Sequence, residues 1–228
     1  MPRILSRAAS FRYPDSQNRL PVPWTLSPER LYPRFLPVGD CALTVEFGDT
    51  VSRELNDAAV ALDLALAAAE IEGIVETAPS YRSLLICYDP AEITHGRLVA
   101  AVRRLLSRPV ARLGGGTAHW TIPIAYDPPF GEDVPELALK LGLSEDAAIA
   151  LHAAGDYRVF VIGFAPGLPY LGGLPDSLHI PRREVLRAPI PVGAVMIGGA
   201  QCAISPVVVP SGFYKVGETP LRPFEPDR

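Results

Sequence analysis

The chain has 228 residues, 48% of them hydrophobic and 20% charged, which is enough apolar material for one large domain or two small ones. Its formal net charge of −4 gives no basic surface for nucleic acid, and no apolar run approaches the ~20 residues that a membrane-spanning helix needs. The three cysteines are widely spaced and form no CxxC pair, so we expect neither a disulfide framework nor a metal site, and we expect a reducing, cytoplasmic location.

Residues 1–30 differ from the rest of the chain, because they hold five arginines against only Asp15 and Glu29. No apolar stretch follows, as it would in a secretory signal. Chain termini are ordered only where something ties them down. We therefore expect a loosely ordered extension.

Residues 31–108 show the pattern of a small α+β domain. The runs at 42–47, 74–79 and 83–89 predict strands. One helix is predicted from a cap at Asp49 or Thr50 to about Glu72, and a second over 92–107. Strand, helix, two strands and helix indicate a ferredoxin-like outline.

The glycines at 114–116 predict a linker over 109–117, and a second domain over 118–228. Within that domain, strands are predicted at 121–127 and 157–164, with helices at 132–141 and 144–154 between them. Short apolar runs separated by Pro and Gly then follow to the end of the chain. That pattern is typical of a β-barrel or a β-sandwich.

Residues 163–175, GFAPGLPYLGGLP, combine four glycines and three prolines with large apolar side chains. A disordered linker would be more polar, and the prolines argue against a helix or a central strand. We therefore expect an ordered loop, and ordered loops of this kind are often functional. Its residues Leu168, Tyr170 and Leu171 are predicted to face a partner protein, unless residues 1–30 fold back and serve as the cover.

Three arginines, Arg182, Arg183 and Arg187, follow this loop within six positions, with Glu184 as the only acid among them. Such crowding predicts an anionic ligand, because guanidinium groups match carboxylate and phosphate geometry. The alternative is a solvated or interface surface.

His152, at the end of a predicted helix, is a candidate acid or base; the alternative is that it caps the helix carbonyls. Gln201 is a further polar candidate, and Tyr170 is either a ligand contact or a core aromatic. The motifs GxxxxGK[ST], GxSxG and HExxH are absent from the sequence. Their absence disfavours a stand-alone ATPase, serine hydrolase or zinc protease.

Four segments carry a family resemblance: HAAGDYRVFVIGFAPGLPYLGGLP, PRR, IPVGAVMIGGAQ and GETPLRPF. In this order they resemble the allophanate hydrolase subunit 1 family, also called the carboxyltransferase subdomain C/D or KipI family, over residues 31–226. The resemblance implies an α+β N-terminal domain followed by a cyclophilin-like β-barrel. It also implies a partner subunit of the subdomain A/B type and a third, LamB/YcsF-like subunit.

The same resemblance implies an activity, the ATP-dependent opening of 5-oxoproline to glutamate by the assembled complex. A small amide or lactam would then meet Arg182, Arg183, Arg187 and Gln201, with Gly167 and Tyr170 in the loop and His152 as acid or base. Two alternatives remain open: a subunit that transfers a carboxyl group from biotin to urea or another amide, and a non-catalytic inhibitor of a histidine kinase.

The sequence departs from the family pattern at several positions. These differences, which bear on substrate identity, are Cys202, Ala203 and Ser205 in place of part of a QTGIYP motif, Ser211 in place of a glycine, and Glu218 in place of an arginine.

Overall fold

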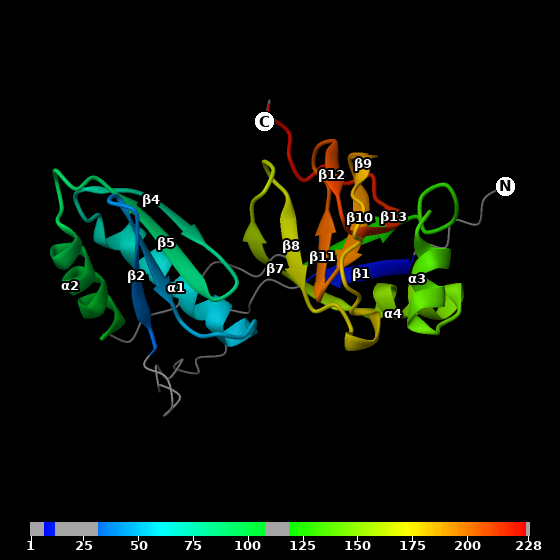
Figure 1. The fold of residues 1–228 in the computed structure, drawn as a ribbon, viewed down its shortest axis with the longest axis horizontal. Coiled ribbons are helices and arrows are strands. Elements are labelled where there is room, and N and C mark those ends of the chain that lie inside the picture. The colour runs from blue at the N-terminus through cyan, green and yellow to red at the C-terminus, as the bar shows by residue number, and fades with distance from the viewer. Residues whose placement is uncertain (1–6, 12–31, 108–118, 227–228) are drawn as a thin grey trace. The chain divides into compact units, whose positions relative to one another are not determined.

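The computed structural model describes residues 7–11, 32–107 and 119–226, and the chain divides into two compact units (Figure 1). Residues 32–107 form the four-stranded unit. Residues 119–226, together with strand β1 (Arg7–Phe11), form the seven-stranded unit. The predicted linker over 109–117 lies outside the described residues. No helix in the described ranges is long and apolar enough to span a membrane.

The four-stranded unit is an antiparallel sheet of order β2-β3-β5-β4 with two helices. Its elements are β2 (Arg34–Val38), β3 (Ala42–Glu46), α1 (Arg53–Ala69), β4 (Ile74–Pro79), β5 (Ser83–Tyr88) and α2 (His95–Leu106). Strand β5 lies between β3 and β4, as in a split βαβ unit. The fourth strand, β2, precedes β3 in the chain, whereas a ferredoxin-like fold places its last strand after the second helix. The predicted ferredoxin-like outline is therefore matched only in part.

Local signals explain where helix α1 begins and ends. Ser52 is the N-cap, since its hydroxyl accepts a hydrogen bond from the backbone N–H of Leu55 at 3.3 Å. The cap is thus two or three residues later than predicted. Glu70 ends the helix in the left-handed conformation. The core of the unit contains Leu43, Leu62, Leu84, Ile86 and Leu98, all fully buried.

The seven-stranded unit contains two sheets, two α-helices and a short 3₁₀ turn. Its further elements are β6 (Trp120–Ile124), α3 (Val134–Leu141), α4 (Glu145–Ala154), β7 (Asp156–Ile162), β8 (Pro169–Gly172), η1 (Asp176–Leu178), β9 (Arg187–Ile190), β10 (Ala194–Gly198), β11 (Gln201–Ile204), β12 (Val209–Ser211) and β13 (Tyr214–Glu218). Strands β9 and β12 pair separately from the main sheet.

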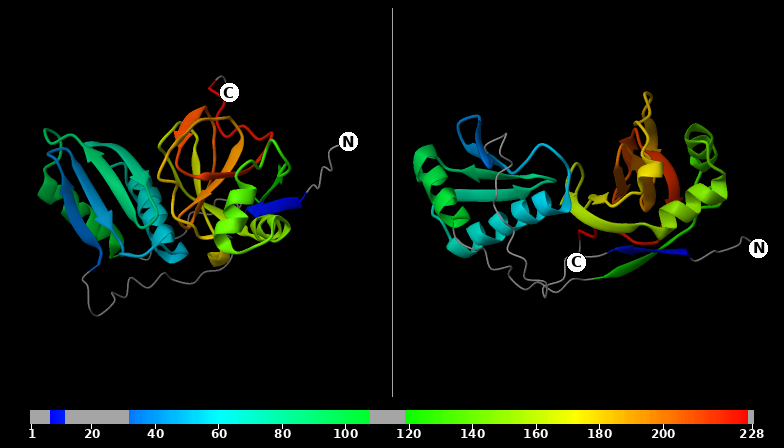
Figure 2. Two further views of the ribbon diagram at one scale, coloured as in Figure 1. Left: turned by 45° about the vertical axis from the view of Figure 1, so that its right-hand side comes forward. Right: turned by 90° about the horizontal axis from the view of Figure 1, so that it is seen from below.

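The main sheet has the order β13-β10-β11-β8-β7-β1-β6 and curls strongly (Figure 2). At one end its two edges meet, because Ala125, just after β6, forms an antiparallel bridge with Glu218 of β13. A single bridge does not close the sheet. The cyclophilin-like barrel implied by the family resemblance is thus not present as a closed barrel, and the architecture is a mixed α/β one with several sheets.

Strand β1 is the largest departure from the predicted organisation. It pairs antiparallel with β6 and parallel with β7, so five residues of the predicted loose extension belong to the main sheet. The remainder of residues 1–30 lies outside the described ranges.

The predicted loop over 163–175 is ordered but contains strand β8. Proline was expected to exclude a strand here. Pro169, however, is the first residue of β8, a position at which proline is tolerated. Strand β8 forms a hairpin with β7 and also pairs with β11.

Strands β10 and β11 have a hydrophobic cluster on each face. Val195, Ile197 and Cys202 face the main core beneath α3 and α4. Met196 and Ala203 face a smaller cluster with Leu168 and Phe213. Because alternate residues of a strand point to opposite faces, this arrangement decides which candidate residues can share a site.

Candidate functional site

Arg182 and Gln201 form an exposed polar pair beside the smaller hydrophobic cluster. The Arg182 Nη2 atom donates a hydrogen bond to Gln201 Oε1 at 3.1 Å, and the guanidinium lies 4.7 Å from the centre of the Phe213 ring. Phe213 is itself buried in that cluster. The ring supports a cation from below while the Arg182 side chain stays open to solvent.

Tyr170 and Gly167 lie around the same cluster. Tyr170 is paired with Ala203 across β8 and β11, and Ala203 is two residues from Gln201 on the same strand face. Gly167 has a φ of +72°, and a Cβ there would lie 2.6 Å from the Cβ of Phe224. Gly167 is thus required by the local backbone, and Tyr170 is half-buried on the side where Gln201 lies.

Arg183 and Arg187 have acidic partners instead of an open anion site. Arg183 Nη1 donates to Asp133 Oδ1 at 3.2 Å and to Glu136 Oε2 at 2.6 Å. Arg187 donates to the same Asp133 oxygen and forms an ion pair with Glu132 at 2.6 Å. Glu184 is thus the only acid among these arginines in the sequence, but Glu132, Asp133 and Glu136 join them in the folded chain. The carboxylates come from the start of α3, some 50 residues earlier in the chain.

Asp133 is the centre of this network and is 1% exposed. Besides both arginines, its carboxylate accepts a hydrogen bond from the backbone N–H of Lys215 at 2.8 Å. The segment between the two anchored arginines, Glu184 to Leu186, is exposed. The network thus fixes that segment against α3 and β13, which is a structural role for two of the three predicted arginines.

The charges at the edge of this network stabilise one another. Lys140 and Arg183 hold the pKa of the Glu136 carboxyl below its usual range through hydrogen bonds. Glu136 in turn raises the pKa of Arg183. Lys140 also donates to the hydroxyl of Tyr214 at 2.9 Å.

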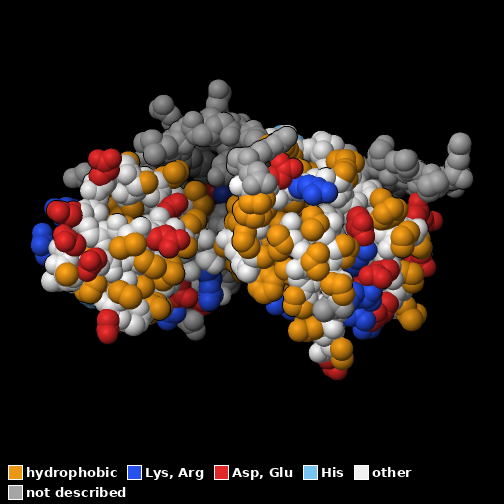
Figure 3. Space-filling model, turned by 90° about the horizontal axis from the view of Figure 1, so that it is seen from above, with side chains coloured by type: hydrophobic (Ala, Val, Ile, Leu, Met, Phe, Trp, Pro, Cys, Tyr) orange, Lys and Arg blue, Asp and Glu red, His pale blue; other side chains and the backbone are white. Residues whose placement is uncertain are grey.

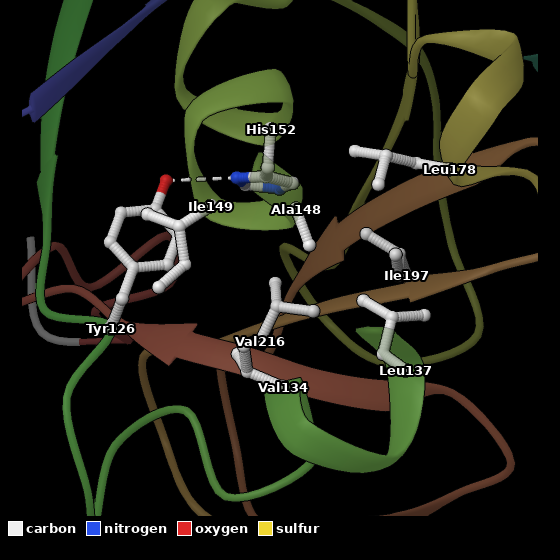
Figure 4. Close-up of a pocket in the computed structure, with 9 residues that line it drawn as sticks. All are labelled: Tyr126, Val134, Leu137, Ala148, Ile149, His152, Leu178, Ile197 and Val216. Atoms are coloured by element: carbon white, nitrogen blue, oxygen red, sulfur yellow. Dashed lines mark hydrogen bonds between the residues drawn. The ribbon is translucent and has the colours of Figure 1, made fainter. Parts of the chain in front are cut away.

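His152 is buried in the main core, at 3% exposure (Figure 4). Its Nδ1 lies 2.9 Å from the hydroxyl of Tyr126, and its Nε2 lies 3.6 Å from the sulfur of Cys202. The hydroxyl of Tyr157 donates to the His152 carbonyl at 2.9 Å. Burial lowers the pKa of the imidazole to about 4, so it is neutral near pH 7.

The space beside His152 is too small for a substrate. The cavity has a volume of about 10 Å³ and is lined otherwise by apolar side chains and Tyr126 (Figure 4). Such a volume holds at most one water molecule. Burial also raises the pKa of Cys202 to about 12, which disfavours a thiolate. This placement favours a structural role for His152 over the predicted acid or base.

Two residues that support the candidate site, Asp133 and Phe213, were not predicted. Acidic residues at a helix start are a recognisable signal, and Glu132-Asp133 precedes Pro135 in the first turn of α3. That signal does not reveal the pairing with arginines far along the chain. Phe213 stands in a segment that departs from the family pattern, and nothing in its surrounding sequence points to Arg182.

The departures from the family pattern have local structural partners. The Ser205 hydroxyl donates to the carbonyl of Val207 at 2.6 Å, and the Ser211 hydroxyl accepts from the N–H of Phe213 at 3.1 Å. Glu218 forms an ion pair with Lys215, which is 5% exposed. The reversed charge at 218 therefore neutralises a buried cation. Within the described ranges, no three His, Cys, Asp or Glu side chains are grouped to hold a metal ion.

Comparison with known proteins identifies the family. Residues 33–228 match the family model for the carboxyltransferase domain, subdomain C and D. The chain belongs to this carboxyltransferase family. The family predicted from the PRR and GFAPGLPYLGGLP motifs is thereby confirmed.

Members of the carboxyltransferase family similar to this chain include a 5-oxoprolinase subunit of Bacillus subtilis (strain 168). It is 31% identical over 199 residues, which cover 83% of each chain. The crystal structure of TTHA0988 matches with 36% identity and a TM-score of 0.71 over 82% of this chain. The present chain spans only 36% of TTHA0988. The Kluyveromyces lactis urea amidolyase matches with a TM-score of 0.64 over 81% of this chain and 13% of its own, but at 20% identity, which shows the fold alone.

Proposed function

We propose that this chain is one subunit of an ATP-dependent 5-oxoprolinase, which opens 5-oxoproline to glutamate in the cytoplasm. Its proposed partners are a subunit of the carboxyltransferase subdomain A/B type and a LamB/YcsF-like subunit. The observation that carries the proposal is the 31% identity to a protein named as a 5-oxoprolinase subunit over 83% of both chains.

The exposed pair of Arg182 and Gln201 is the proposed contact for the substrate. 5-Oxoproline carries a carboxylate, a carbonyl oxygen that accepts hydrogen bonds and a lactam N–H that donates one. A guanidinium matches the carboxylate, and a primary amide has both donor and acceptor atoms for the lactam. Phe213 beneath the guanidinium keeps its orientation fixed. Arg183 and Arg187 support this site indirectly, through the segment they anchor to Asp133.

ATP would be bound by the assembled complex, since the sequence has no GxxxxGK[ST] loop to cradle its phosphates. We therefore expect no turnover by this chain alone. The test is to purify the chain alone and with its two proposed partner subunits, and to supply ATP and 5-oxoproline. Phosphate and glutamate should be released together by the three-subunit mixture and should not exceed the blank with the single chain.

Two results would contradict the proposal. The first is steady phosphate release by the isolated chain. The second is a stable three-subunit complex that releases no glutamate. Carboxyl transfer from biotin to urea by that complex, or tight binding to a histidine kinase without turnover, would each replace the proposal with one of the alternatives predicted from the sequence.

A further inference from the structure

The end of the β7–β8 hairpin, residues 162–168, is a compact tip without any charged residue. The N–H of Gly163 donates to the carbonyl of Leu168 at 3.1 Å, and the N–H of Leu168 donates to the carbonyl of Ala165 at 3.0 Å. Two hydrogen bonds within so short a segment hold its backbone in one shape. Figure 3 views the chain from above relative to Figure 1, and hydrophobic side chains cover much of the surface of the seven-stranded unit in this view.

The apolar residues of the hairpin divide into an inward and an outward set. Leu168 and Leu171, which were predicted to face a partner, are buried at 3% and 1% exposure. Ile162 and Phe164 point outward instead, at 64% and 72% exposure. The exposed apolar side chains of this hairpin are therefore Ile162 and Phe164, and not the leucines that were predicted to face a partner.

Phe164 is held in a backbone conformation that large side chains avoid. Its φ is +68°, in the left-handed region that favours glycine. Gly163, one position earlier, has no positive φ. The chain thus has a phenylalanine at the position where a glycine would suit the backbone best. Folding of the tip does not explain the ring, since it is neither packed nor conformationally favourable.

The tip is also supported from behind. Gly167 packs so closely against Pro223 and Phe224 that a Cβ would lie 2.9 Å from the Pro223 carbonyl oxygen. Leu168 is inserted in the smaller hydrophobic cluster. The backbone that holds Phe164 is therefore rigid. Because a rigid aromatic side chain has few conformations to lose, little conformational entropy is lost when a partner covers it.

From this geometry we infer that Phe164, together with Ile162, docks into an apolar pocket on a second subunit of the complex. The inference rests on the proposed function for the identity of that subunit, which we take to be the subdomain A/B partner. Relatives of this chain are named as one subunit of 5-oxoprolinase, and in TTHA0988 the matched region is joined to further chain that makes up most of the protein. Because the tip has no charged residue, the pocket must be apolar. Buried aromatic anchors of this kind dominate binding energy at protein interfaces.

The test measures, by titration and size exclusion, how the full chain assembles with the subdomain A/B partner. Phe164→Gly should weaken the complex by about 30-fold or more, as expected for a central aromatic anchor. Its thermal midpoint should be no lower than that of Phe164→Ala, because glycine tolerates the positive φ. Leu139→Ala is the matched control, since Leu139 is an 82% exposed apolar residue on α3, and it should leave assembly unchanged.

Several results would overturn the inference. Wild-type affinity in Phe164→Gly would overturn it, even if the complex turns over 5-oxoproline and the proposed function stands. A large fall in the thermal midpoint of both Phe164 variants would show that the ring stabilises the fold of this chain and does not serve as a docking residue. NMR contacts from the Phe164 ring to distant residues of the same chain, in the dilute free chain, would assign the cover to this chain itself. Self-association that Phe164→Gly abolishes would assign it to a second copy. Conversely, a complex that depends on Phe164 but releases no glutamate supports the inference and contradicts the proposed function. A wild-type chain that binds no subdomain A/B partner contradicts both.

Discussion

Arg182 and Arg183 are neighbours in the chain but lie in different surroundings. Arg183 is tied to Asp133 and Glu136 at the start of α3, whereas Arg182 lies exposed over the Phe213 ring. Gln201 and Cys202 repeat this contrast on β11. Gln201 contacts Arg182 at the surface, and Cys202 contacts the buried His152.

The contrast shows that a short polar motif can serve two purposes at once. In both pairs, one residue is part of a network that stabilises the seven-stranded unit, and its neighbour lies in the polar pair that we propose as the substrate contact. Proximity in sequence was the reason for grouping these residues with His152 in one site. The strand and loop geometry separates them into a buried polar set around Asp133 and His152 and an exposed pair of Arg182 and Gln201.

The strongest test of the buried set is Asp133→Ala. This change leaves Arg183 and Arg187 without their shared carboxylate and the Lys215 N–H without its acceptor. Removing one partner from a buried ion network typically costs about 3–5 kcal/mol. We expect a loss of that size in the free energy of unfolding, measured by urea denaturation. A loss below about 1 kcal/mol would show that the network is not structural.

His152 predicts a dependence of stability on pH. Its pKa is about 4 in the folded chain against an ordinary 6.5, so the unfolded chain takes up the proton more readily. The free energy of unfolding should therefore fall as the pH drops from about 6.5 to about 4, by about 3 kcal/mol.

Thermal or urea unfolding at several pH values measures this slope. His152→Gln should flatten it between pH 6.5 and 4.5, while His119→Gln, at an exposed position, should leave it unchanged. An unaltered slope in His152→Gln would mean that other groups cause the acid sensitivity.

Arg182→Ala tests the exposed pair. Because hydrogen bonds to charged groups contribute about 1.5–3 kcal/mol, binding of 5-oxoproline to the assembled enzyme should weaken roughly 10- to 150-fold. The free energy of unfolding should change by no more than about 0.5 kcal/mol, as for most surface substitutions. Arg183→Ala, in contrast, should lower the free energy of unfolding, because it removes the hydrogen bonds to Asp133 and Glu136. Equal effects of both variants on stability would remove the distinction between the two arginines.

Much of the secondary structure could be predicted because its periodicity is strong. Both helices of the four-stranded unit, its strands β3 to β5, and helices α3 and α4 all occur where the sequence predicts them. Strands β2 and β8 were missed for local reasons. β2 contains Pro37 and is mostly exposed, so it lacks the apolar alternation of a half-buried strand. β8 is only four residues long and begins with Pro169.

The site was less predictable, because its decisive contacts join distant parts of the chain. Asp133 meets Arg183 across 50 residues, and Arg182 meets Gln201 across 19. No local pattern encodes such pairs. The separation of Gln201 from Cys202 could have been predicted, however, since adjacent residues on a strand point to opposite faces.

The position of strand β1 affects the order in which the two units fold during synthesis. It lies between β6 and β7, so its hydrogen-bonding partners on both sides are encoded more than 100 residues later. At a synthesis rate of ~5–20 residues per second, roughly 8–30 s pass between the emergence of β1 and the completion of β7. During that interval the whole of residues 32–107 emerges as an uninterrupted sequence that contains its own hydrophobic core. We therefore expect the four-stranded unit to be the first folded part of the nascent chain. Strand β1 remains unpaired until β6 and β7 have been synthesised and pair with it.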